Sequence, residues 1–101
     1  MRIELTMRRA ESLPVESVPL RIPRCKWMTV HATPHIDAEG RVTDLWGATE
    51  VSTGACLPIT PASSIPALVR TIREWVTNRR IDKYKWDRMV ARTRLFKARL
   101  L

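Results

Sequence analysis

Apolar and polar residues alternate at the start of the chain, in the stretch RIELTMRR (residues 2–9). Ile3, Leu5 and Met7 fall on one side of an extended backbone, and charged or hydroxyl residues fall on the other. Period-two alternation is typical of a strand with one buried face. We therefore predict an amphipathic strand at residues 2–9, or an extended arm that adds to a sheet.

The next stretch, residues 12–24, is interrupted by Pro14, Pro19 and Pro23. Proline fixes its own φ, removes a backbone donor and biases the preceding residue toward extended geometry. No helix is expected there. Residues 1–24 are predicted to form an N-terminal strand or arm followed by an irregular, semi-rigid connector.

The pattern of residues 25–60 predicts a β-hairpin region. The runs CKWMTVHAT (25–33) and RVTDLWGATEVS (41–52) are rich in β-branched and aromatic residues, which favour strands. The acids and the glycine between them are typical of a hairpin loop. We expect the second strand to bend at Gly47, and a short third strand in the segment ACLPI.

Apolar positions with a period near 3.6 predict two basic amphipathic helices in residues 63–101. Ser63 or Ser64 is expected to cap the first helix, which ends near Asn78. Asp82 is expected to cap the second, from about Lys83 to Arg99. The buried stripe of this last helix is predicted to contain Trp86, Met89, Val90, Thr93, Phe96 and Leu100.

The predicted strands precede the predicted helices in the chain, and this order is typical of an α+β fold. We predict a small antiparallel sheet of three to four strands in the N-terminal two-thirds, packed against the two C-terminal helices. A chain of 101 residues corresponds to a single domain, residues 1–101.

No apolar run approaches the roughly 20 residues needed to cross a bilayer, and the N-terminus lacks the apolar centre of a signal peptide. Two cysteines, Cys25 and Cys56, suit a reducing compartment and are expected to be free thiols. A cytoplasmic protein without a membrane partner is therefore expected.

The formal net charge of +8 belongs to the last third of the chain. From Arg70 onward the sequence holds eleven Lys and Arg against three acids, a net of +8, whereas residues 1–69 hold seven of each sign. Such asymmetry points to an acidic partner: nucleic acid, an anionic membrane surface or an acidic protein face. The membrane is disfavoured because the apolar face of the helix is needed to cover the sheet.

The cations of the last helix fall on one exposed face when residues are placed 100° apart. Arg88, Arg92 and Arg99 group together with Lys85 beside them, and the ~1.5 Å rise per residue spreads the arginines over about 16 Å. Arginine makes bidentate hydrogen bonds with phosphate and carboxylate groups. The candidate residues for binding nucleic acid or an acidic partner are Arg79, Arg80, Lys85, Arg88, Arg92 and Arg99.

Other chemistry is weakly indicated. His31 and His35 with Cys25 and Cys56 offer four zinc-ligand types, but Pro34 separates the histidines in an extended segment and no CxxC pair is present. No phosphate-binding glycine loop or Ser-His-Asp signature is visible, so neither a catalytic residue, a metal nor a cofactor is predicted.

Trp27 is a candidate anchor for a partner if its strand face is exposed. Packing under the N-terminal arm is the alternative. A symmetric dimer through Trp27 or an exposed strand edge also stays open.

The order of a tryptophan strand, a hairpin, the segment TGACLP (53–58) and an amphipathic helix resembles small proteins of phages and other mobile elements, over about residues 26–77. The leading hypothesis is a non-enzymatic binding protein whose Arg-rich C-terminal helix engages nucleic acid or a nucleoprotein complex. One alternative is an inhibitor or adaptor that blocks a host complex through protein contacts, as phage anti-CRISPR proteins do. A small metal-dependent hydrolase or nuclease is a second alternative, and a solvated basic face without a specific role also stays open.

Overall fold

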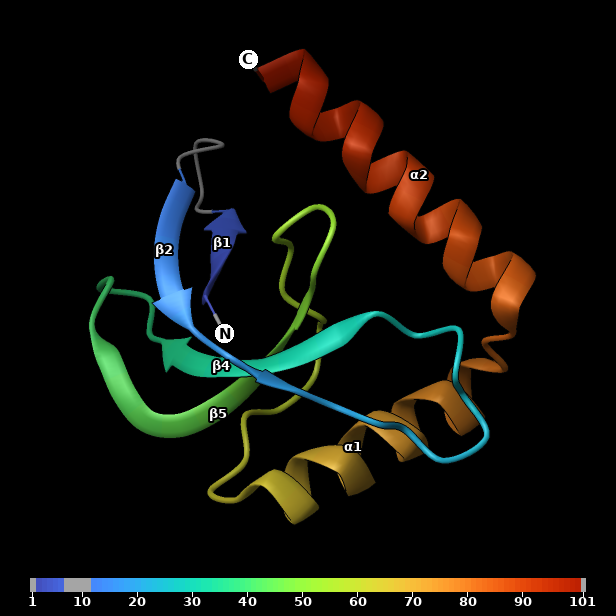
Figure 1. The fold of residues 1–101 in the computed structure, drawn as a ribbon, viewed down its shortest axis with the longest axis horizontal. Coiled ribbons are helices and arrows are strands. Elements are labelled where there is room, and N and C mark those ends of the chain that lie inside the picture. The colour runs from blue at the N-terminus through green and yellow to red at the C-terminus, as the bar shows by residue number, and fades with distance from the viewer. Residues whose placement is uncertain (1, 7–11, 101) are drawn as a thin grey trace.

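A computed structural model describes residues 2–6 and 12–100 of the chain, and its fold is α+β with small antiparallel sheets (Figure 1). The predicted fold class is confirmed, although the strands divide between a two-stranded sheet, β1-β2, and a three-stranded sheet, β3-β4-β5. The elements in chain order are β1 (Arg2–Thr6), β2 (Ser12–Glu16), β3 (Val18–Pro19), β4 (Val30–Ile36), β5 (Val42–Glu50), α1 (Ile65–Arg79) and α2 (Lys83–Leu100).

The N-terminal segment contains more strand than the sequence predicts. β1 pairs antiparallel with β2, with Ile3 opposite Val15, and β3 pairs with β4. The prediction of an irregular connector over residues 12–24 was therefore wrong for its first half. Proline is tolerated because β2 has one unpaired edge, which needs no donor. Residues 7–9 of the predicted first strand lie outside the described residues.

The hairpin of β4 and β5 is confirmed, with corrected details. β4 begins only at Val30, and residues 25–29 form turns instead of the predicted strand. The irregularity in the pairing lies between Pro34 and Ile36 of β4, while Gly47 pairs in regular register with Thr33. Between these two positions β5 advances from Trp46 to Val42 while β4 advances only from Pro34 to Ile36, so the extra residues form a bulge in β5 away from Gly47. The predicted third strand is reduced to one bridge, between Thr49 and Cys56.

β4 is buried on both faces. Val30 and Ala32 belong to the apolar core together with Leu68 and Ile72 of α1. Residues between them along the strand point to the opposite face, where polar pairs replace apolar contacts. The pairs are Ser17 Oγ with His31 Nδ1 and Thr33 Oγ1 with Thr49 Oγ1, each at 2.8 Å.

Both predicted helix caps are confirmed. The backbone N–H of Ala67 donates to Ser64 Oγ at 3.2 Å, and that of Lys85 donates to Asp82 Oδ1 at 2.8 Å. α1 ends at Arg79, and the next residue, Arg80, caps it in the left-handed conformation common at helix C-termini. None of the described helices is long and apolar enough to span a bilayer.

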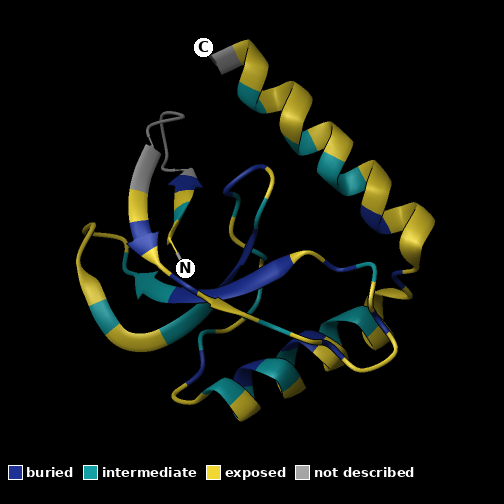
Figure 2. Cartoon of the chain, in the orientation of Figure 1, coloured by how far each residue is buried: buried dark blue, intermediate teal, exposed yellow. Residues whose placement is uncertain are grey.

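The apolar contacts of the last helix are concentrated in its first half. Trp86 is 3% exposed and Met89 is half-buried, whereas Phe96 is 63% exposed. α2 runs from the end of α1 past the loop that follows β5 (Figure 1), and most of its surface is exposed (Figure 2). The predicted buried stripe was therefore wrong at Phe96, because no sheet lies beneath that part of the helix.

Candidate functional site: a cationic cleft between the two helices

The loop at residues 51–55 is ordered by a buried carboxylate at the end of β5. Glu50 is 4% exposed and accepts five hydrogen bonds from backbone or hydroxyl donors of Ser52 and Thr53, and one more from Thr29 Oγ1 at 3.1 Å. Burial acts to raise the pKa of Glu50, but the hydrogen bonds from Thr53 and Ser52 outweigh it and hold the pKa below its ordinary value. This carboxylate is therefore charged at neutral pH and fixes the loop.

Two cations on one flank of α2 rest on this loop. Arg94 Nη2 donates to Ser52 Oγ at 3.0 Å, and Lys97 Nζ donates to the carbonyl oxygen of Thr53 at 3.1 Å. The buried ring of Trp86 holds the start of the same helix. Together these contacts set the direction of α2 relative to α1.

The opposite flank of α2 and the end of α1 enclose a hollow of about 310 Å³, here called the cationic cleft. Its apolar walls come from Pro58, Trp75, Ile81 and Met89. Four cations also line it: Arg79, Lys85, Arg88 and Arg92. No acidic side chain lines the cleft within the described part of the chain.

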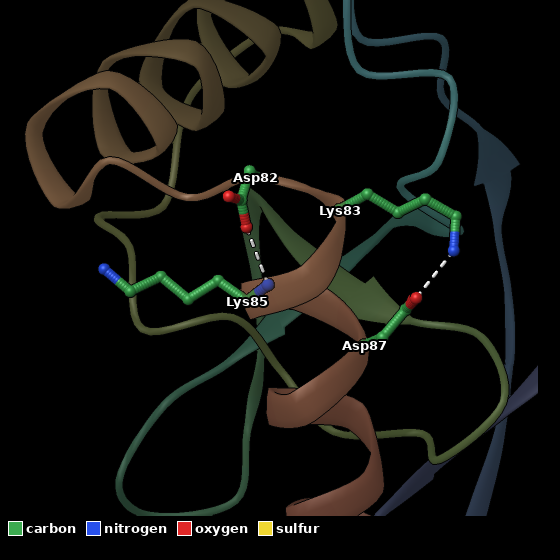
Figure 3. Close-up of polar contacts among 4 residues, drawn as sticks. All are labelled: Asp82, Lys83, Lys85 and Asp87. Atoms are coloured by element: carbon green, nitrogen blue, oxygen red, sulfur yellow. Dashed lines mark hydrogen bonds and ion pairs between the residues drawn. The ribbon is translucent and has the colours of Figure 1, made fainter.

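The two acids near the start of α2 are engaged elsewhere. Asp82 caps the helix, and Asp87 forms an ion pair of 2.6 Å with Lys83. Figure 3 shows Lys83 and Asp87 on one side of the helix and the Lys85 side chain extending to the other. The cleft cations are therefore not neutralised by either carboxylate of their own helix.

Local contacts orient the cleft cations. Lys85 Nζ donates to the carbonyl oxygen of Arg79 at 2.9 Å, which joins α2 to the end of α1. The Arg88 guanidinium lies 5.6 Å from the centre of the Tyr84 ring, within the range of a cation–π contact. The side chain of Arg92 makes no hydrogen bond or ion pair with the residues that the structure describes. All four cations are exposed, so their charges face solvent.

Four of the six predicted binding cations meet at this cleft: Arg79, Lys85, Arg88 and Arg92. Arg80 lies outside it and terminates α1, and Arg99 is exposed two turns beyond Arg92. Trp27 is half-buried, with its ring centre 6.1 Å from that of Trp86. Trp27 therefore packs against α2 while part of its side chain stays exposed, and its role as a partner anchor stays a prediction.

The histidines and cysteines are dispersed. His31 is hydrogen-bonded to Ser17, and its burial lowers the pKa of the imidazole. Cys25 is buried and Cys56 is exposed. Among residues 2–6 and 12–100, no three His, Cys, Asp or Glu side chains come together in a group that could hold a metal ion.

Trp75 is a cleft residue that is absent from the candidate residues predicted from the sequence. It is half-buried and forms part of the cleft wall. The available signal is its position at the edge of the apolar stripe, one turn before Arg79. An aromatic ring at such an edge is shared between core and surface.

Comparisons of the chain with models of protein families, with curated proteins and with solved structures find no match to any of them. The features of the chain that point to a function are therefore the cationic cleft and α2.

Proposed function

We propose that this chain is a non-enzymatic small binding protein, of phage or mobile-element type, whose Arg-rich α2 engages nucleic acid or a nucleoprotein complex. The observation that carries the proposal is the cationic cleft, which Arg79, Lys85, Arg88 and Arg92 line and no acidic side chain of the described residues lines. A concentration of unpaired cations raises the local potential and attracts polyanions.

The side-chain types favour phosphate as the group bound. Arg88 and Arg92 present planar guanidinium groups that form paired hydrogen bonds with phosphate oxygens. Lys85, Arg88 and Arg92 are spread over about 10 Å of helix axis, at ~1.5 Å per residue. That length matches more than one phosphate of a backbone. Arg99 extends the same face toward the end of α2.

The test compares two double charge reversals with the same change in net charge. Arg88→Glu/Arg92→Glu alters the cleft, whereas Arg70→Glu/Arg73→Glu alters exposed arginines on α1 that line a different hollow. Affinity for unrelated duplexes and single strands is measured by fluorescence anisotropy. We expect the cleft variant to bind roughly tenfold or more weakly, because direct phosphate contacts are lost. Equal weakening in both variants would show that only overall charge matters and would contradict the proposal.

A protein partner is the second candidate. Leu95 is 54% exposed and Phe96 is 63% exposed, in the second half of α2. Exposed aromatic and aliphatic side chains near arginines are typical of protein interfaces. An inhibitor or adaptor would place this surface on an acidic face of a host complex. Two results together would favour this function. The wild-type protein would bind no nucleic acid near physiological salt, and it would bind a host partner that the Phe96→Ala variant does not bind.

A further inference from the structure

We infer that the cationic cleft holds an unpaired nucleobase together with its neighbouring phosphates, so that the chain prefers single-stranded nucleic acid over duplex. This inference rests on the proposed function and specifies its ligand. It follows from three features of the cleft: its apolar wall, the four cations that line it and its size.

The wall of the cleft is apolar and contains an aromatic ring. Trp75 and Met89 are half-buried and come from different helices, while Ile81 is buried between them in the chain. Trp75 therefore presents part of its ring to the hollow. Stacking of a base on an aromatic side chain is tolerant of sequence, because every base has a flat π face. A purely phosphate-binding surface needs no such wall.

Cations line the same hollow as this wall. Arg88 precedes Met89 on α2 and Arg92 follows it one turn later, while Arg79 lies one turn beyond Trp75 on α1. A base is joined to the phosphates before and after it through its sugar. A base placed against Trp75 therefore brings phosphates to these cations, and charge complementarity holds both parts at once.

The size of the cleft separates single strands from duplex. About 310 Å³ lies at the lower end of the range for small-molecule sites, which suits one planar ring system. Bases in a duplex are stacked on one another and leave no face free for Trp75. A duplex can meet only the outer cations, so it should bind by charge alone.

The experiment uses the full chain and two oligonucleotides of equal length, one intact and one with abasic sites, which carry the same phosphates. We expect the abasic strand to bind roughly five- to a hundredfold more weakly at the same salt concentration, the range for loss of one stacked base. The matched duplex should also bind more weakly than the intact strand. Equal affinity of all three ligands would overturn the inference and leave the proposed function standing.

Tryptophan fluorescence locates the contact. The intact strand should quench the emission of wild-type protein, and Trp75→Phe should remove most of that quenching while retaining the fold. Trp27→Phe is the matched control, because Trp27 packs on Trp86 and neither ring lines the cleft, so this variant should keep the quenching. Quenching that survives Trp75→Phe would overturn the inference. If no nucleic acid binds at all, and an acidic peptide binds instead, both the inference and the proposed function are wrong.

Discussion

At the scale of single residues, Glu50 decides where α2 can lie. Its carboxylate fixes Ser52 and Thr53, and these two residues in turn accept hydrogen bonds from Arg94 and Lys97. The cations on the two flanks of α2 therefore have different roles. Those that contact the loop hold the helix, and those that line the cleft remain available to a ligand.

Glu50→Gln should lower the free energy of unfolding by about 2 kcal/mol at neutral pH, because hydrogen bonds to a charged acceptor become weaker or are lost. Urea denaturation measures the change. Glu39→Gln is the matched control, since Glu39 lies in the exposed hairpin loop and should change stability by less than about 0.5 kcal/mol. Similar losses in both variants would contradict the role of Glu50.

The contribution of Glu50 should also depend on pH. Its pKa in the folded protein lies below the ordinary value near 4.5. The unfolded state therefore takes up a proton first as pH falls. The stabilisation from Glu50 is complete above the ordinary pKa and is lost as pH falls through the lower pKa of the folded protein. Denaturation of the wild type and of Glu50→Gln across pH 3–7 should give stabilities that converge at the acidic end. A constant difference over the series would show that the charge of Glu50 is not what stabilises the loop.

At the scale of elements, α2 has a buried anchor near its start and only polar contacts with the loop at residues 51–55 in its second half. Trp86 packs into the core and against Trp27, whereas Phe96 contributes little buried surface. The cleft lies beside the first half, where the direction of the helix is best fixed. The second half carries Arg99 and offers additional contact with a partner.

Trp86→Ala should cost about 3–5 kcal/mol of unfolding free energy, the usual loss for a buried aromatic residue. Phe96→Ala should change stability by no more than about 0.5 kcal/mol, as expected for an exposed site. Chemical denaturation of both variants measures these values under one condition. A large loss for Phe96→Ala would indicate that the second half of α2 is buried in solution, by a second copy of the chain or by contact with its own body.

The helices could be predicted closely from the sequence because their signals are local. Ser64 and Asp82 cap the helices as expected from single residues and their spacing. β2 and β3 were missed because pairing depends on a partner strand, which proline-rich local sequence does not reveal. The cleft could be predicted from the sequence only in part. Helical periodicity grouped Lys85, Arg88 and Arg92, but the meeting of Trp75 and Arg79 with them depends on how two helices cross.

At the scale of the whole molecule, the net positive charge is confined to the helical C-terminal third of the chain. Residues 1–69 are neutral overall, and the net charge of +8 belongs to the segment that forms α1, α2 and their junction. The sheets and the Glu50 loop act as a support that holds the cationic helices in one arrangement. Binding in this account is primarily electrostatic, and stacking in the cleft adds selectivity for single strands.

The most direct measurement is the salt dependence of binding to a single-stranded oligonucleotide. Each phosphate neutralised contributes about −0.7 to the slope of log K against log salt concentration. With four cations in the cleft, the wild type should give a slope of roughly −3, and Arg88→Glu/Arg92→Glu should give a slope at least about 1.4 units shallower. Binding that is insensitive to salt, or equal slopes for the two proteins, would contradict the account.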